Sequence, residues 1–120
     1  MENVAVVGAS PHSDRYSNRA MKMLEECGHN PIPVAPARDE ILGRRVYPTL
    51  AAVPERVDTV TMYIRPSLQR AVLDDALRLK PRRIIFNPGT ENADEYERLR
   101  EAGIEVIEAC TLIMLGSKQF

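Results

Sequence analysis

The chain has 120 residues, of which 44% are hydrophobic and none is tryptophan. This length fits one domain over residues 1–120 with a modest aliphatic core, since single domains cluster at roughly 100–150 residues. The formal net charge is -1, with acidic and basic residues spread along the chain. That balance gives no electrostatic basis for nucleic acid as the main partner.

No apolar run approaches the roughly 20 residues that a membrane-spanning helix needs. The first residues, Met1-Glu2-Asn3, lack the basic start of a signal peptide. Cys27 and Cys110 are the only cysteines and form no C-x-x-C pair, so we expect two buried or half-buried thiols. A redox role for Cys110 stays open. Together these features predict a protein of the reducing cytoplasm without a membrane partner.

The first quarter of the chain predicts a strand followed by a helix. Val4–Val7 is a continuous apolar run, typical of a strand covered on both faces. We expect Ser17 to cap a helix that ends at Gly28, a plausible left-handed residue. The apolar positions of this helix recur at helical spacing and are Ala20, Met23, Leu24 and Cys27.

The next segment predicts a second strand and a less regular connection. Pro31–Val34 is the expected strand, and Pro36 closes it. We expect Glu40–Arg45 to form a loop or a short turn, and Pro48–Val53 a short helix. Thr59–Ile64, rich in β-branched residues, is the third predicted strand.

The remaining chain continues the alternation. A helix is expected from Arg65 to about Leu79, and its core-facing side chains are Leu68, Val72, Leu73, Ala76 and Leu77. Arg83–Phe86 is the fourth predicted strand and Glu105–Ile107 the fifth. Between them, Asn92 and Glu95 resemble a capping box that starts a helix ending at Gly103.

Strands that alternate with helices of this length predict right-handed crossovers and a parallel sheet. We therefore expect an α/β fold with a doubly wound, mainly parallel sheet of five strands and helices on both faces. In such sheets the ligand lies beyond the carboxyl ends of the strands, where the strand order reverses.

The residues that follow the strands form a polar, weakly cationic set. Small residues, hydroxyl groups, an amide and two arginines converge there, as expected of a site for a nucleotide-like anion. The candidate residues after the four strands are Gly8, Ala9, Ser10, Pro11, His12, Ser13, Pro36, Arg38, Arg65, Asn87, Pro88 and Gly89.

The pattern disfavours NAD as the ligand. NAD sites usually carry G-x-G-x-x-G and an acidic residue after the second strand. Here Gly8 is followed by Ala9-Ser10-Pro11, and Arg38 stands at the second strand tip before Asp39. An arginine fits a phosphate on the adenosine ribose, which coenzyme A carries on its 3′ oxygen and NADP on its 2′ oxygen. Both ligands remain open at this point.

An ordered set of motifs resembles the small CoA-binding proteins and the N-terminal CoA-binding domain of the succinyl-CoA synthetase α subunit. The set includes Gly8-Ala9-Ser10, Arg15–Ala20, Gly28-His29, Pro33-Val34, Pro36, Ile41-Leu42-Gly43 and Asn87-Pro88-Gly89. The resemblance extends from Val4 to about Cys110 and implies a Rossmann-like domain that binds coenzyme A or an acyl-CoA.

The resemblance also implies roles for individual residues. Ser10–Ser13 lie where the synthetase loop contacts coenzyme A, and Arg38 stands where that family places a lysine near the ribose phosphate. Phe86-Asn87-Pro88 matches the strand tip that contacts the cofactor. Relatives often carry a glutamine before the glycine of this tip, so Asn87-Pro88 is a departure that could alter ligand choice.

The chain favours binding over catalysis, with no metal site expected. It contains no P-loop, G-x-S-x-G or H-E-x-x-H, and the synthetase phosphohistidine belongs to a second domain. His12 near Asp14 is more simply a solvated loop residue than an acid–base pair. Arg65 fits either a ligand phosphate or a pairing with Asp58 or a helix carboxylate.

Three functions follow as hypotheses. The first is a carrier or regulatory module for coenzyme A or acyl-CoA. The second is an NADP-binding half of an oxidoreductase, and the third is an interaction module whose site is vestigial. Leu112–Leu115 should pack on the domain or form a contact with a second copy or a partner enzyme.

Overall fold

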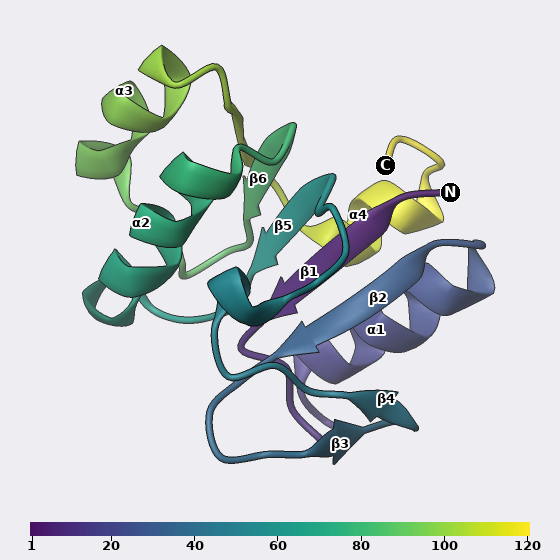
Figure 1. Ribbon diagram of the computed structural model, residues 1–120. Helices are drawn as coiled ribbons and strands as arrows, with labels where there is room; N and C mark the ends of the chain where they lie inside the picture. Colours follow the sequence, from purple (N-terminus) through teal and green to yellow (C-terminus); the bar gives the residue numbers. More distant parts are fainter.

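The computed structural model describes all residues from Met1 to Phe120, and its centre is a five-stranded parallel sheet (Figure 1). The sheet order is β2-β1-β5-β6-β7, and every neighbouring pair runs parallel. The strands are β1 (Asn3–Val7), β2 (Asn30–Val34), β5 (Thr59–Met62), β6 (Arg83–Phe86) and β7 (Glu105–Glu108). All five predicted strands are thus present.

Helices cover both faces of the sheet. In Figure 1, α1 (Tyr16–Glu26) and α4 (Thr111–Gly116) lie on one side, and α2 (Arg70–Leu79) and α3 (Ala93–Glu101) on the other. The predicted doubly wound, Rossmann-like α/β fold is confirmed. None of the helices combines the length and the apolar character that crossing a membrane requires.

The first strand supplies both hydrophobic cores. Val4 and Val6 belong to the core beneath α1 and α4, whereas Ala5 and Val7 belong to the core beneath α2 and α3. Successive side chains of a strand point to opposite faces, so a strand covered on both sides favours apolar residues throughout. This is why the run is continuous rather than alternating.

The segment Glu40–Arg45 differs from the prediction of a loop or short turn. It forms an antiparallel pair of short strands, β3 (Glu40–Ile41) and β4 (Arg44–Arg45). Leu42 and Gly43 connect them with φ angles of 52° and 75°. Positive φ at both central residues is the requirement of a type I′ hairpin turn, which usually carries Asn or Asp in place of Leu42.

The expected helix from Arg65 to Leu79 is divided. A 3₁₀ turn, η2 (Pro66–Leu68), precedes α2, and the Leu68 side chain is 56% exposed rather than buried in the core. The short helix expected near Pro48–Val53 is present as the 3₁₀ turn η1 (Leu50–Ala52), and the Thr49 hydroxyl accepts a hydrogen bond from the Ala52 N–H at 3.2 Å.

Both predicted N-terminal caps use other interactions. Ser17 is buried inside the first turn of α1, whose N-cap is Arg15 with no side-chain cap bond. Asn92 does precede α3, but its amide donates to Gln69 Oε1 at 3.1 Å instead of capping the helix. The Glu95 carboxylate pairs with Arg98, so no capping box forms.

The ends of the helices agree better with the sequence. Gly28, with φ of 85°, follows α1 as a left-handed residue.

Both cysteines are free, and Cys110 is half-buried as expected, but Cys27 is exposed. On α4, Leu115 packs in the core with Val4, while Ile113 remains 70% exposed.

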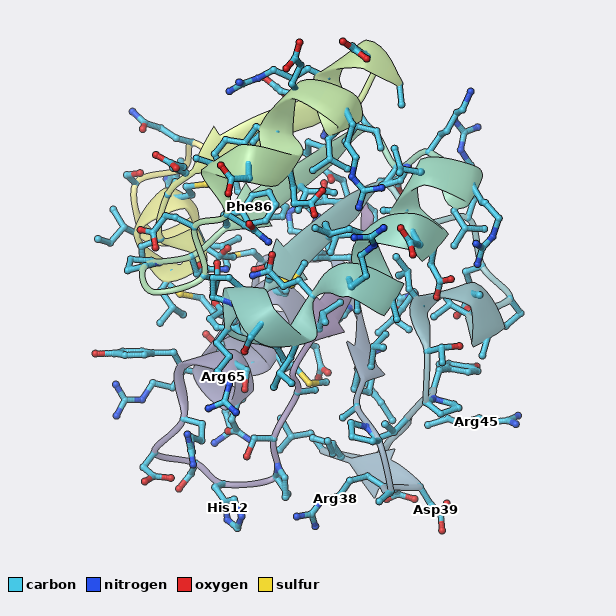
Figure 2. The ribbon with its side chains drawn as sticks, turned by 90° about the vertical axis from the view of Figure 1, so that its left-hand side faces the viewer. His12, Arg38, Asp39, Arg45, Arg65 and Phe86 are labelled. Atoms are coloured by element: carbon cyan, nitrogen blue, oxygen red, sulfur yellow. The ribbon has the colours of Figure 1, made fainter.

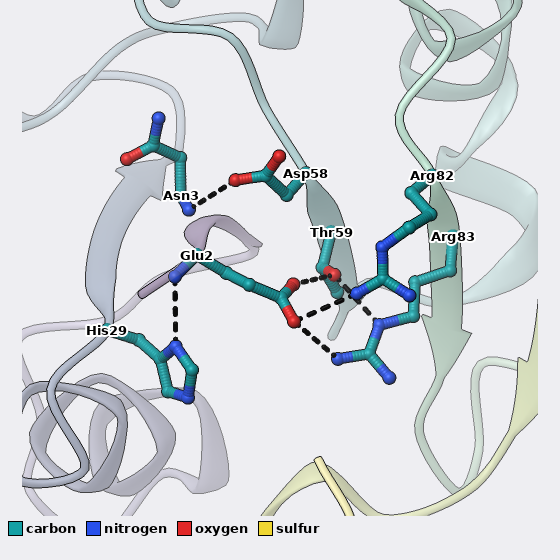
Figure 3. Close-up of polar contacts among 7 residues, drawn as sticks. All are labelled: Glu2, Asn3, His29, Asp58, Thr59, Arg82 and Arg83. Atoms are coloured by element: carbon teal, nitrogen blue, oxygen red, sulfur yellow. Dashed lines mark hydrogen bonds and ion pairs between the residues drawn. The ribbon is translucent and has the colours of Figure 1, made fainter.

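The two chain ends meet at the amino ends of the strands (Figure 1). The Glu2 carboxylate lies 2.9 Å from Arg82 and 3.2 Å from the buried Arg83 guanidinium (Figure 3). The Phe120 ring lies 4.4 Å from that guanidinium and 5.0 Å from the His29 ring. Burial lowers the pKa of Arg83, and the Glu2 carboxylate opposes this effect.

We expect Glu2→Gln to lower the free energy of unfolding by about 2 kcal/mol, because it leaves the buried Arg83 guanidinium without its carboxylate. Denaturant titration followed by circular dichroism measures this loss. Glu26→Gln, on the exposed surface of α1, is the matched control and should stay within about 0.5 kcal/mol of the wild type. Equal stability of the two variants would contradict the assignment.

Candidate functional site

The strand order reverses beside β1, which has β2 on one side and β5 on the other. In doubly wound sheets, the crevice beyond the carboxyl ends of the strands at this point is the usual ligand site. Here the chain leaves β1 through Gly8, whose φ is 89° and whose N–H donates to the Val34 carbonyl at 3.0 Å. Gly8 therefore marks the centre of the candidate site.

The missing side chain of Gly8 serves the packing of the protein itself. A Cβ atom at this position would lie 2.8 Å from Ile64 Cγ2 and 3.2 Å from the Tyr63 carbonyl carbon. The sequence suggested that this glycine permits a close approach to a ligand. The structure shows that it permits a close approach of the two strand tips.

An apolar cavity of about 320 Å³ lies on the α2 side of Gly8. Eight of its 13 lining residues are hydrophobic, and they come from the tips of β1, β2 and β5, from the segment around η1, and from α2. The lining residues include Pro36, Thr49, Leu68, Ala71, Val72 and Asp75. Its volume falls at the lower end of typical small-molecule sites.

A polar cavity of about 350 Å³ lies on the α1 side of the same glycine. Its walls are the loop after β1, the first turn of α1 and the tips of β5 and β6. The lining residues are Gly8, Ser10, Arg15, Tyr16, Ser17, Tyr63, Pro88 and Thr90. Because Gly8 lines both cavities, one extended ligand can cross the tip of β1 and occupy both.

Two hydrogen bonds between side chains and backbone hold the loop after β1, and the tip of the loop is exposed. The Asn18 amide donates to the Ser10 carbonyl at 2.9 Å, and the Ser10 hydroxyl accepts from the His12 N–H at 3.1 Å. Pro11, His12 and Ser13 are exposed. No hydrogen bond or ion pair joins His12 to Asp14, in agreement with the interpretation of His12 as a solvated loop residue.

The two candidate arginines are exposed and unpaired. Arg38 follows β2 in a turn where Ala37 has a φ of 57°, and Figure 2 shows it extending from the same end of the molecule as His12. Arg65 forms no ion pair, and Asp58 instead accepts a hydrogen bond from the Asn3 N–H at 2.8 Å. Both guanidinium groups are therefore free for a phosphate.

The β6 tip divides into buried and exposed residues. Phe86 is 0% exposed and packs on Tyr96. Asn87 is 2% exposed, and its amide donates to Thr61 Oγ1 and to the Met62 carbonyl while its oxygen accepts from the Thr111 N–H. The side chains of Phe86 and Asn87 therefore face the core and not the cleft. The contact of this tip with a cofactor stays a prediction, and Pro88 and Gly89 are its exposed residues.

The cavities contain only some of the predicted residues. Gly8 and Pro36 line the apolar cavity, and Gly8, Ser10 and Pro88 line the polar one. Ala9 is buried in the core with Val4. Phe86 and Asn87 are buried and line neither cavity. The other candidates are exposed and also lie outside both cavities, and they are Pro11, His12, Ser13, Arg38, Arg65 and Gly89.

Tyr63 and Asp75 are among the lining residues that sequence reasoning missed. Tyr63, which falls within the third predicted strand, lines the polar cavity, and its buried hydroxyl has no hydrogen-bond partner. Asp75 lines the apolar cavity from α2. The spacing of Asp75 from Leu68 and Val72 places all three on one helix face, which was the available signal.

Burial raises the pKa of the Tyr63 hydroxyl to about 12, against the opposing influence of the nearby Thr61 and Thr111 hydroxyls. These hydroxyls reach no hydrogen-bond geometry with the phenol; instead, Thr61 Oγ1 and Thr111 Oγ1 share a bond of 2.8 Å. The folded protein therefore favours the neutral phenol.

We expect alkaline pH to destabilise the protein partly through Tyr63. Since the folded pKa is raised, the stabilisation is complete below pH 10 and is lost towards pH 12, by about 2 to 3 kcal/mol. Denaturant titrations from pH 9 to 12 should show a shallower decline for Tyr63→Phe than for the wild type. Tyr16→Phe removes an exposed phenol and should leave the wild-type slope unchanged.

We expect Gly8→Ala to lower the free energy of unfolding by about 3 kcal/mol, because a positive φ and a steric overlap with Ile64 act together. Gly89→Ala is the matched control: its φ is 91°, but no atom lies within 4 Å of the new Cβ. This variant should lose only about 1 kcal/mol, the backbone cost alone. Equal losses in denaturant titrations would show that Ile64 gives way.

Comparison with known proteins identifies the family. A family model described as the CoA binding domain matches residues 2–116, so the chain belongs to the CoA-binding domain family. This confirms the resemblance seen in the sequence.

Individual relatives extend the comparison. The chain is 30% identical to the uncharacterized protein YneT of Bacillus subtilis, over 88% of this chain and 78% of that protein. It is 29% identical to the ADP-forming acetate–CoA ligase I of Archaeoglobus fulgidus over 94% of this chain, but this match spans only 17% of the ligase. A crystal structure of an uncharacterized protein superposes with a TM-score of 0.92 at 43% identity, covering 100% of this chain and 98% of that one.

Proposed function

We propose that this chain binds coenzyme A or an acyl-CoA at the carboxyl ends of its strands and acts in the cytoplasm as a carrier or regulatory module. Membership of the CoA-binding domain family supports coenzyme A as the ligand. The single structural observation that carries the proposal is the pair of cavities that meet at Gly8, with an unpaired Arg38 on the rim.

The proposed pose assigns each part of coenzyme A to a matching surface. The apolar cavity receives the flat adenine ring, and Arg38 on the rim receives the 3′-phosphate of the ribose. The diphosphate lies over Gly8 and Ser10, near the start of α1, where free N–H groups and the helix dipole favour anions. The pantetheine arm then follows the polar cavity past Tyr63 and Pro88.

Two features support binding without catalysis. His12, the histidine nearest to the cleft, is exposed and has no carboxylate partner to position it. The acetate–CoA ligase relative is a much longer protein, of which the match spans 17%. Ligation therefore has no evident machinery in these residues.

Ile113, 70% exposed on α4, is part of the surface through which we expect a second copy or a partner enzyme to bind.

NADP is the second candidate, because an exposed arginine after β2 also suits a 2′-phosphate. A thermal-shift panel of coenzyme A, acetyl-CoA, NAD, NADP and ATP separates the hypotheses. We expect the largest increase in Tm with coenzyme A or acetyl-CoA. A larger increase with NADP would favour a dinucleotide-binding protein, and no increase with any nucleotide would favour a vestigial site.

We expect Arg38→Glu to weaken coenzyme A binding by about tenfold or more in calorimetry, because a phosphate loses its cation and faces a carboxylate. Arg45→Glu is the matched control, since Arg45 is also exposed but stacks on Tyr47 away from the cavities (Figure 2). It should retain near wild-type affinity.

Dephospho-coenzyme A provides the second arm of this test. The wild type should bind it more weakly than coenzyme A, whereas Arg38→Glu should bind both with similar affinity. An undiminished preference for the 3′-phosphate in Arg38→Glu would place that phosphate elsewhere. Failure of the wild type to bind coenzyme A at high micromolar concentration would refute the proposed function.

A further inference from the structure

Asp75 is the only charged residue that lines the apolar cavity. It projects from α2 among mostly hydrophobic residues, and only 13% of its side chain is exposed. A carboxylate in such surroundings is costly unless other groups satisfy its oxygens. The cost of burying the Asp75 carboxylate therefore depends on which donors its two oxygens accept from.

Two protein groups use part of the carboxylate. Asp75 Oδ2 accepts a hydrogen bond from the Ala51 N–H at 3.1 Å, and Asp75 Oδ1 pairs with Arg78. An ionised carboxylate offers about four acceptor positions, so these two contacts leave capacity for a further donor. The Ala51 contact also fixes η1 against α2 and so keeps the wall of the cavity in place.

The other polar side chain of the cavity, Thr49, is neutral and only partly engaged. The Thr49 hydroxyl accepts the hydrogen bond from the Ala52 N–H that caps η1. A ring that enters between Pro36, Leu68 and Val72 therefore meets one strong acceptor, the Asp75 carboxylate. A polar donor that loses its water on entry needs such a partner.

We infer that Asp75 accepts a hydrogen bond from the exocyclic amino group of the adenine ring and thereby makes the apolar cavity selective for a 6-aminopurine. This inference rests on the proposed function, because it concerns the base of the same ligand. Adenine carries a single amino donor, and a carboxylate can only accept. Asp75 thus determines which base the cleft takes, while the aliphatic wall supplies the burial.

The test compares two ligands on the full chain by calorimetry. The first is adenosine 3′,5′-bisphosphate, and the second is the purine riboside analogue that lacks only the amino group. The wild type should bind the analogue about tenfold or more weakly, as expected for a lost hydrogen bond to a charged group. In Asp75→Leu, which has no acceptor, this ratio should fall to about twofold or less. In Asp75→Asn, which keeps a neutral acceptor, it should fall to an intermediate value.

The ratio isolates recognition from stability, because both ligands bind only the folded protein and any loss of folded fraction cancels. Asp74→Asn is the matched control: Asp74 is the adjacent carboxylate but pairs with Arg70 and Arg98 outside the cavity. It should keep the wild-type ratio. The two Asp75 variants guard against the failure of either one to fold.

The outcomes separate the inference from the proposed function. If the wild type binds the two ligands equally, or if both Asp75 variants keep the wild-type ratio, the role of Asp75 is overturned while coenzyme A binding stands. If the wild type binds neither bisphosphate nor coenzyme A, the proposed function fails and the inference fails with it.

Discussion

The close approach of the β1 and β5 tips is the constraint on which the candidate site depends. At Gly8 a side chain would overlap Ile64, so the absence of one atom lets the two strands end side by side. Their shared end separates an apolar cavity from a polar one, and Gly8 belongs to both. The glycine thus shapes the cleft by allowing the two strand tips to pack against each other.

The fold could be predicted because the inner strands β1, β5 and β6 are buried on both faces. Continuous apolar or β-branched runs such as Val4–Val7 and Thr59–Met62 are typical of strands that are covered by helices on both faces. Local features were harder because tertiary contacts override them. Asn92 gives its amide to Gln69 rather than to its own helix, and the turn at Leu42-Gly43 adopts hairpin geometry without its usual polar residue.

The sequence predicted which residues lie at the carboxyl edge of the sheet, but it did not predict which way their side chains face. Residues that follow a strand are bound to reach the carboxyl edge, which is why Ser10, Pro36 and Pro88 were found. Whether a strand-tip side chain faces the cleft or the core is decided by the neighbouring layer, and Asn87 turns inward to join β5 with α4. Asp75 was not predicted as a cavity residue because the prediction for its helix covered only the side chains that face the core.

The cluster of Glu2, Arg83 and Phe120 has a practical meaning for work with this protein. It fixes both chain ends at the amino edge of the sheet, at the opposite ends of the strands from the cleft (Figure 1). Tags, fluorophores or surface anchors attached through a short linker at either end will therefore leave the cleft open to solvent. A binding assay on immobilised protein can use this geometry directly.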